Sequence, residues 1–166
     1  MRIISANLNG IRSAATKGFF DWLPGQGADV VCVQELKAQD ADMRPEFRAC
    51  DGLHGHFHYA EKKGYSGVGL YTRKPAQTLI EGLGVPEFDA EGRYIEAEFG
   101  NLAVISLYQP SGSSSEERQQ AKFRFLDAFF PHLEKLMQSG REIVICGDWN
   151  IAHREIDLKN RKSNQK

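Results

Sequence analysis

Short apolar runs recur along the chain at the length typical of β-strands. Eight of them predict strands over residues 2–7, 29–34, 56–60, 67–72, 77–83, 93–99, 101–108 and 142–146. Glycines such as Gly64, Gly84 and Gly100 lie between the runs and indicate turns. Residues 94–99 alternate between apolar and polar, which predicts a half-exposed strand, whereas residues 102–105 are all apolar and predict a central strand.

Two segments have the pattern of helices. The first covers residues 11–23 and ends at Pro24-Gly25. The second begins at Ser114 or Ser115, whose hydroxyls suit a helix N-cap. Pro131 predicts a kink or a split in this second helix. Its apolar residues are spaced by three or four, which predicts one face packed on the core, formed by Phe123, Leu126, Phe130, Leu133 and Met137. Together these elements predict a layered α/β (α+β) domain.

The length and composition fit a globular domain. The chain has 166 residues, of which 41% are hydrophobic and 26% charged. Its formal net charge is −1 at pH 7 and its pI is about 6.5. A strongly basic protein is therefore excluded, and any nucleic acid would have to bind to a local basic face.

The cysteines and the N-terminus indicate where such a protein acts. Three cysteines, Cys32, Cys50 and Cys146, are too few and too scattered for a disulfide framework. Two of them lie inside apolar runs, where cysteine behaves as a small buried hydrophobe. The N-terminus has no long apolar segment, and no run approaches the length of a membrane span. We therefore expect a cytoplasmic protein without a membrane partner.

Polar side chains follow four of the apolar runs directly. The side chains at these strand ends are carboxylates, amides and a phenol: Asn7, Glu35, Tyr108, Asp148 and Asn150. A lone Asn or Asp after a strand is more often a turn former or cap. Five such groups at strand ends favour a site instead, because rigid strands hold side chains in place while the loops stay open.

This set of groups suits metal-dependent hydrolysis of a phosphodiester. Mg²⁺ prefers oxygen ligands, often one or two carboxylates with water and substrate phosphate. Glu35 is the candidate metal ligand, with Asn7 beside it, and Asp148 could orient and polarise a water. Asn150 and Tyr108 could donate hydrogen bonds to the developing charge.

Two other patterns carry less weight. The histidines of residues 54–58 recur at every second position, but their spacing fits no standard zinc site, so a polar strand or loop is expected there. Residues 111–115 are rich in serine but match neither a nucleophile elbow nor a phosphate-binding loop.

Six short motifs occur in a fixed order along nearly the whole chain, and four of them contain the strand-end residues. They are SANLNGIR at 5–12, VQELK at 33–37, GYSGVG at 64–69, EGR at 91–93, YQPSG at 108–112, and GDWNIAH at 147–153 with its extension DLKN at 157–160. This series resembles the exonuclease III and AP-endonuclease family, within the endonuclease/exonuclease/phosphatase superfamily. One departure is Ser111, where some relatives carry Asn.

The resemblance implies a fold and an activity. The fold would be a four-layered αββα sandwich. The activity would be that of an exodeoxyribonuclease III-like hydrolase, a 3′-to-5′ exonuclease and abasic-site endonuclease in base-excision DNA repair. It would use Mg²⁺, with Mn²⁺ as a substitute, and act as a monomer. Glu35 and Asn7 would serve the metal, Asp148 would align or deprotonate the attacking water, and Asn7, Tyr108 and Asn150 would complete the catalytic set.

The resemblance also implies a DNA-binding face for duplexes with abasic sites or 3′ ends. Arg12 and Lys17 would contact phosphates, and Gly64 and Tyr65 would press on the minor groove. Asn160 and Asn164 would grip the backbone near the lesion. An abasic nucleotide would be selected by flipping it out, which costs least where no base stacks.

Family members of this kind run to about 250 residues as one domain. We therefore expect residues 1–166 to form a single nuclease domain that lacks the C-terminal third, with its R-x-D strand and closing S-D-H motif. Two alternatives stay open. One is a superfamily phosphatase acting on inositol lipids or another phosphoester, and the other is a catalytically inactive DNA-binding fragment.

Overall fold

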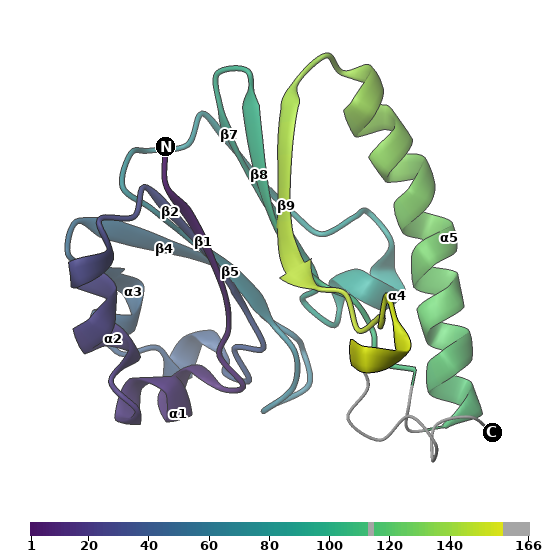
Figure 1. The fold of residues 1–166 in the computed structure, drawn as a ribbon. Helices are drawn as coiled ribbons and strands as arrows, with labels where there is room; N and C mark the ends of the chain where they lie inside the picture. The colour runs from purple at the N-terminus through teal and green to yellow at the C-terminus, as the bar shows by residue number, and fades with distance from the viewer. Residues whose placement is uncertain (113–114, 158–166) are drawn as a thin grey trace.

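The computed structural model describes residues 1–112 and 115–157. Within these residues, two β-sheets are stacked on each other and helices cover the outer face of each sheet (Figure 1). The predicted αββα sandwich is therefore confirmed. Three hydrophobic clusters fill the spaces between the layers.

The first sheet has five strands in the order β1-β2-β5-β4-β3. Their bounds are β1 Ile3–Asn7, β2 Val30–Gln34, β3 Ala49–Cys50, β4 Leu53–His58 and β5 Val68–Thr72. β1 and β2 run parallel, with Asn7 opposite Gln34, so both strands end on the same side of the sheet. The short strand β3 was not predicted, and β4 begins three residues before the predicted start at His56.

The second sheet has four strands in the order β6-β7-β8-β9. Their bounds are β6 Thr78–Glu81, β7 Tyr94–Phe99, β8 Leu102–Tyr108 and β9 Glu142–Asp148. β8 and β9 are parallel, with Tyr108 opposite Asp148. The ends of β8 and β9 therefore lie at the same edge of the second sheet.

The predicted half-exposed strand over residues 94–99 is wrong in its burial. β7 lies between β6 and β8, and its first four residues are buried, including the carboxylate-bearing Glu96 at 1% exposure. Glu96 accepts a hydrogen bond from the Tyr94 hydroxyl, so its polar group has a partner inside the fold. The alternating pattern therefore marks a buried polar network rather than a solvent-facing side.

The first predicted helix is broken into short pieces. α1 covers Ile11–Thr16, α2 covers Phe19–Trp22, and a 3₁₀ turn follows over Leu23–Gln26. Gly18 separates α1 from α2 with a φ of +85°, a left-handed conformation that ends a helix. The remaining short helical segments are α3 Pro45–Arg48 and α4 Pro86–Asp89, with 3₁₀ turns over Asp40–Asp42 and Glu155–Asp157.

The second predicted helix is α5, which runs from Glu116 to Gln138 without interruption. Ser115 is its N-cap, and the Ser115 hydroxyl accepts a hydrogen bond from the Arg118 N–H. The predicted split at Pro131 is wrong, because apolar residues before and after it pack on the second sheet. In the described part of the chain, no helix combines the length and the apolar character needed to cross a membrane.

The predicted core-facing side of α5 is wrong for three of its five residues, whereas Leu133 does pack against the hydrophobic cluster under the helix. Phe123, Phe130 and Met137 are 48%, 55% and 71% exposed. The buried side instead carries Phe125 and Phe129, which stack on each other with ring centroids 5.8 Å apart. Both sides of the helix have apolar residues at helical spacing, and only the shape of the second sheet selects one of them.

The space between the sheets is apolar with one polar tie. Gln34 donates a hydrogen bond of 3.0 Å to the Ser106 hydroxyl, which itself donates to the Val33 carbonyl at 3.1 Å. Both side chains are buried. This tie joins the end of β2 to β8 and so aligns the two sheets close to their shared edge.

Two thiols meet in the same interlayer space. Cys32 of β2 is buried, and Cys146 of β9 packs against the same cluster. A hydrogen bond between the two thiols, together with burial, raises the pKa of Cys32 well above its ordinary value. The Cys32 thiol therefore stays protonated at neutral pH, and all three cysteines of the chain are free.

A polar network also lies between α5 and the second sheet. His132 Nε2 lies 2.8 Å from the Tyr94 hydroxyl, whose other partner is the buried Glu96 carboxylate. Burial lowers the pKa of His132 below its ordinary value of 6.5, although the charge of Glu96 opposes this shift. Folding therefore favours the neutral imidazole of His132.

We predict that Phe125→Ala lowers the free energy of unfolding by about 3–5 kcal/mol, because it empties a buried ring site. Phe123→Ala, two residues away on the exposed side, should change the free energy of unfolding by less than about 1 kcal/mol. Urea unfolding followed by circular dichroism measures both values. A larger loss of unfolding free energy in Phe123→Ala than in Phe125→Ala would show instead that the face predicted from the sequence is the buried one.

We predict that acidification from about pH 7.5 to about pH 5.5 destabilises the chain partly through His132. Since the pKa of His132 is lower in the folded state, the unfolded chain binds the proton more readily, and stability falls as pH drops through the unfolded value. His132→Gln should reduce this loss of unfolding free energy, and His153→Gln, at an exposed histidine, should not. Equal pH dependence in both variants would contradict the prediction.

Candidate active site at the strand ends

Four strand ends meet at one edge of the sandwich. The parallel pairs β1–β2 and β8–β9 each end at this edge, and β1 and β9 lie next to each other where the sheets stack (Figure 1). Of the five strand-end residues, Asn7, Tyr108 and Asp148 are the last residues of their strands, Glu35 directly follows β2, and Asn150 lies two residues after β9. The structure therefore brings the predicted set together.

Asn7 connects the two carboxylates of the site. Its side-chain nitrogen donates to Glu35 Oε1 at 2.8 Å and to Asp148 Oδ2 at 2.9 Å. Its side-chain oxygen accepts a hydrogen bond of 3.0 Å from the backbone N–H of Asn9. The amide thus has a fixed orientation, with its donors toward the carboxylates, and it holds Glu35 and Asp148 as close neighbours.

Lys37 balances the charge of Glu35. Its ammonium lies 2.7 Å from Glu35 Oε2, and it also donates to the Asn9 side-chain oxygen. Burial alone would raise the pKa of Glu35, but hydrogen bonds from Lys37 and Asn7 and the charge of Lys37 outweigh it and lower the pKa below 4.5. The carboxylate is therefore ionised at neutral pH.

Tyr108 faces Glu35 from the second sheet. Burial, followed by the negative charge of Glu35, raises the pKa of Tyr108 to about 12. The phenol therefore stays protonated at neutral pH and can act as a hydrogen-bond donor, and a hydrogen bond to Glu35 contributes to the lowered pKa of that carboxylate.

Asn150 holds the loop around Asp148. Its backbone N–H donates to Asp148 Oδ1 at 3.0 Å, and its side-chain amide donates to the Gln109 carbonyl at 2.8 Å. Its own carbonyl accepts a hydrogen bond of 2.7 Å from Lys122 of α5. Both oxygens of Asp148 thus have partners, one from the end of β1 and one from the loop after β9.

Several site residues have left-handed backbone conformations, which cost about 1–3 kcal/mol each for residues other than glycine. Their φ angles lie between +47° and +55°, at Asn9, Glu35, Lys37 and Asn150. The turn after β2 is held by Gly67, whose carbonyl accepts the Leu36 N–H at 3.0 Å. Gly67 has a φ of +85°, and a Cβ there would lie 3.1 Å from Leu36 Cβ, so glycine is required.

The donor set fits a hard divalent cation. Glu35 and Asp148 present carboxylate oxygens at the shared edge, and the Glu35 carboxylate is ionised and already holds a cationic partner in Lys37. Within the described residues no cluster of three or more His, Cys, Asp or Glu side chains forms a larger ligand cage. A site with one or two carboxylates is typical of Mg²⁺, which keeps several of its waters.

A hollow of about 500 Å³ borders the site on the α1 side. It is lined by Asn7, Asn9, Lys17 and Trp22 among others. Arg12, near the start of α1, is exposed and donates to the Lys37 carbonyl at 3.3 Å. Of the two predicted phosphate contacts, Lys17 therefore shares this hollow with Asn7, and Arg12 contacts the backbone of Lys37 and pairs with Asp42 at 3.4 Å.

Gly64 and Tyr65 lie in the connection between β4 and β5. Gly64 is exposed with a φ of +69°, and a Cβ there would meet no atom within 4 Å. The Tyr65 hydroxyl accepts hydrogen bonds from Arg93 at 2.9 Å and Arg118 at 2.7 Å. The two remaining predicted DNA contacts, Asn160 and Asn164, lie outside the described residues.

Four cations near the site had no role in the sequence-based prediction. Lys37 and Arg93 lie inside the quoted motifs, whereas the other two lie on α5, namely Arg118 and Lys122. Arg118 and Lys122 are four residues apart, so they share a face of the helix whose start was predicted from Ser115. The four-residue spacing could have shown from the sequence that Arg118 and Lys122 share one face of α5. It does not reveal that this face contacts the site.

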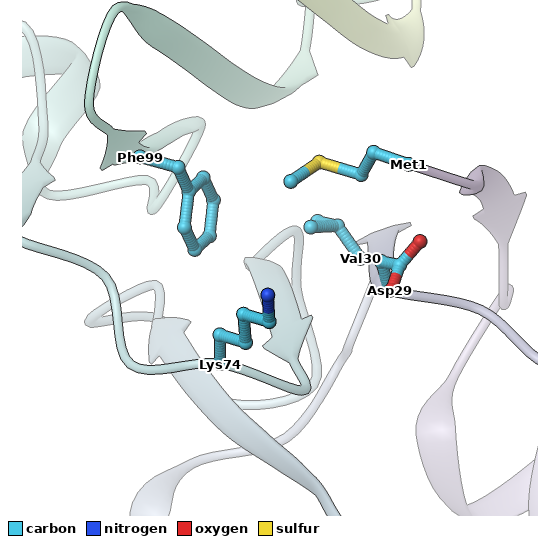
Figure 2. Close-up of a pocket in the computed structure, with 5 residues that line it drawn as sticks. All are labelled: Met1, Asp29, Val30, Lys74 and Phe99. Carbon is cyan, nitrogen blue, oxygen red and sulfur yellow. The ribbon is translucent and has the colours of Figure 1, made fainter.

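A second cavity, of about 290 Å³, lies away from the site. It is lined by Met1, Asp29, Val30, Lys74 and Phe99, whose side chains surround it in Figure 2. Met1 and Val30 are at the beginnings of the strands that end in the candidate site, so this cavity is at the opposite edge of the sandwich. It does not contribute to the carboxylate pair.

Comparison with known proteins shows what the chain as a whole is similar to. The model of the Endonuclease/Exonuclease/phosphatase family matches residues 4–166. The chain is 39% identical to the exodeoxyribonuclease of Bacillus subtilis, over 99% of this chain and 64% of that protein. It is 36% identical to a DNA-(apurinic or apyrimidinic site) endonuclease of Dictyostelium discoideum, over 100% of this chain and 46% of that protein.

A solved structure shows the same arrangement. The catalytic domain of Xenopus laevis APE2 superposes with a TM-score of 0.81 and 28% identity, over 93% of this chain and 60% of that one. The chain thus spans less than two thirds of the length of each of these proteins. The similarity in both sequence and fold extends over nearly all of the chain itself.

We predict that Lys37→Met raises the pKa of Glu35, because it removes the hydrogen bond and the charge that favour the carboxylate. In the wild type this lowered pKa stabilises the folded chain above about pH 4.5, and the stabilisation is lost as pH falls through the folded value. Carboxyl ¹³C NMR titration measures the shift. Lys37→Arg should keep the pKa low, and an unchanged pKa in Lys37→Met would assign the effect to Asn7 instead.

Proposed function

The chain belongs to the endonuclease/exonuclease/phosphatase family, and from this premise we propose that it carries the catalytic carboxylates of a metal-dependent DNA phosphodiesterase. The observation that supports the proposal most strongly is the single amide of Asn7, hydrogen-bonded to both Glu35 and Asp148. It joins a candidate metal ligand from one sheet to a candidate base from the other. The proposed reaction is exodeoxyribonuclease III-like, with abasic-site incision and 3′-end trimming in base-excision repair.

Glu35 is the proposed metal ligand, and Asn7 keeps its carboxylate in place. When bound, Mg²⁺ or Mn²⁺ would neutralise charge on the phosphate and on the leaving oxygen. Glu35 suits this role because its lowered pKa keeps it ionised. Lys37, which already contacts Glu35 Oε2, supplies a further positive charge beside the reacting phosphate.

Asp148 is the proposed acceptor of the proton from the attacking water. Its two oxygens are oriented by Asn7 and by the Asn150 N–H, so the carboxylate has one fixed direction. Tyr108 remains protonated and could donate a hydrogen bond to the phosphate oxygens as charge develops. Asn150 completes the proposed catalytic set, next to Asp148.

DNA is the proposed partner. The Dictyostelium relative is named for abasic-site incision and the Bacillus relative for exonuclease activity on DNA. Exposed Arg12 and Lys17 beside the site support phosphate binding here, and Gly64 and Tyr65 are proposed to contact the minor groove. An abasic nucleotide would enter the site by flipping, which costs least without a stacked base. Asn160 and Asn164 retain their proposed role without structural support.

The proposal includes the state and the place of action. We propose a monomer that acts in the cytoplasm, and the three free thiols support a reducing compartment. Residues 1–166 are proposed to belong to a single nuclease domain. The hydrophobic cluster between the sheets supports this, because it joins the first half of the chain to the second.

We predict Mg²⁺-dependent incision of a duplex with one abasic site, abolished by EDTA. Asp148→Asn should lower the rate at least about 100-fold, because it removes the proton acceptor. Glu35→Gln should raise the Mg²⁺ concentration needed for half-maximal rate. Asp127→Asn, at an exposed carboxylate of α5, should change neither value. Denaturing gel electrophoresis of a labelled strand measures the incision rate of the wild type with and without EDTA and of each variant.

A phosphate-release assay and a duplex-binding assay, run beside the incision assay, separate the alternatives. Phosphate release from inositol phosphates without DNA incision would identify a superfamily phosphatase. Salt-sensitive duplex binding without incision, unchanged by Asp148→Asn, would identify a catalytically inactive DNA-binding protein.

A further inference from the structure

Three cations from different segments surround the ring of Tyr65. Lys62 Nζ lies 5.2 Å from the ring centroid, and the guanidinium carbons of Arg93 and Arg118 lie at 5.7 and 5.5 Å. Glu91 is the acid in contact with this group. We refer to Lys62, Tyr65, Arg93 and Arg118 as the Tyr65 cluster. Among the described residues, its three cations face two acids, Glu91 in direct contact and Glu117 through its charge on Arg118.

The two arginines of the Tyr65 cluster have different surroundings. Arg93 is 2% exposed and donates to the Glu91 carboxylate, the Tyr108 carbonyl and the Tyr65 hydroxyl. The Arg118 side chain is 39% exposed. Among its described contacts, the Tyr65 hydroxyl lies at hydrogen-bonding distance and the nearest Glu91 oxygen lies at 3.8 Å. A guanidinium has five N–H donors, so Arg118 has the capacity for a further acceptor.

The Tyr65 cluster is connected to the catalytic residues through direct contacts. The Arg93 guanidinium lies 5.0 Å from the ring centroid of Tyr108, and the Tyr108 hydroxyl hydrogen-bonds to Glu35. Arg118 therefore stands at the outer end of a continuous series that starts at the proposed metal ligand. Arg93, which packs on Tyr108, donates a hydrogen bond to the Tyr65 hydroxyl, and the same hydroxyl accepts one from Arg118.

Arg118 lies across the site from the other proposed phosphate contacts. α1, which carries Arg12, covers the first sheet, whereas α5 covers the second and begins near the edge where the strands end (Figure 1). The ends of β1 and β9 lie between the two helices. A nucleic-acid strand passing over Asn7 and Asp148 would meet cations on both sides.

We propose that Arg118 binds a DNA phosphate on the α5 side of the site, held in position by Tyr65. This inference rests on the proposed function, since it extends the same DNA-binding face. It adds an anchor from the second sheet to the α1 contacts, so that both halves of the sandwich would grip the substrate. A phosphate is the class of ligand indicated, because a guanidinium matches its oxygens in geometry and charge.

A purely structural role for Arg118 is the alternative, in which it only fastens the Tyr65 loop to α5. The helix offers a matched control for this alternative. Arg124 lies on the same helix and is paired with Glu87 at 2.6 Å. Arg118→Gln and Arg124→Gln each remove one positive charge and an ion pair with a glutamate, but only Arg118 belongs to the Tyr65 cluster.

The test is binding of a fluorescein-labelled duplex with one abasic-site analogue, measured by anisotropy in EDTA from about 50 to about 200 mM KCl. We expect Arg118→Gln to weaken binding about tenfold at the lowest salt and to reduce the slope of log K against log salt by about 0.9. Arg118→Lys should retain most of the slope, because an ammonium also neutralises a phosphate. Arg124→Gln should keep the wild-type slope. Circular dichroism confirms folding, and Arg118→Ala provides the same test if Arg118→Gln does not fold.

The outcomes separate this inference from the proposed function. A wild-type slope in Arg118→Gln or Arg118→Ala, with a wild-type chain that binds the duplex, overturns the role of Arg118 and leaves the nuclease proposal standing. An equal reduction in Arg124→Gln also overturns it, because net charge alone would then explain the effect. Failure of the wild-type chain to bind the duplex at low salt overturns both.

Discussion

The side-chain amide of Asn7 is the interaction on which the candidate site depends. Its nitrogen donates to one carboxylate from each sheet, Glu35 and Asp148, and these bonds exist only while the two sheets are stacked with their ends aligned. The buried hydrogen bond from Gln34, the residue before Glu35, to Ser106 provides that alignment. The arrangement of Glu35 and Asp148 therefore depends on how the two sheets pack. A change that shifts one sheet against the other would separate the carboxylates.

Bringing two carboxylates together requires compensating charge. Lys37 and the Asn7 donors outweigh the desolvation of Glu35 and keep it ionised, although the turn that carries Glu35 and Lys37 has a left-handed backbone. The surrounding contacts, including the close approach of Gly67, offset this strain. The chain as a whole has a net charge of −1, so binding of the proposed anionic substrate would depend on the cations at this edge. The left-handed backbone and the compensating positive charge thus both occur in the turn that carries Glu35 and Lys37.

Much of the fold and most of the site were readable from the residues. Apolar runs and turn residues located all the longer strands, and the groups that follow these strands are the ones that meet in space. The sequence could predict four site residues because a side chain at the end of a strand lies at the edge of the sheet, whichever strand is its neighbour. They are Asn7, Glu35, Tyr108 and Asp148. The cations that hold these groups were harder to predict. Lys37 acts through a turn of unusual backbone conformation, and Arg93 and Arg118 act through Tyr65, far from each of them in sequence.

By itself, the sequence determined the positions of the strands, the start of α5 and the chemical class of the site, because each of these depends on neighbouring residues. The tertiary structure decided which side of α5 is buried, since Phe123 and Phe125 both belong to apolar stripes and only the second sheet distinguishes them. It also decided that β7 is buried on both faces, because its two neighbouring strands and α5 enclose Glu96 and give it a hydrogen-bond partner. Local patterns record which residues can be buried, whereas the choice among them is made by the surfaces that meet when the layers pack.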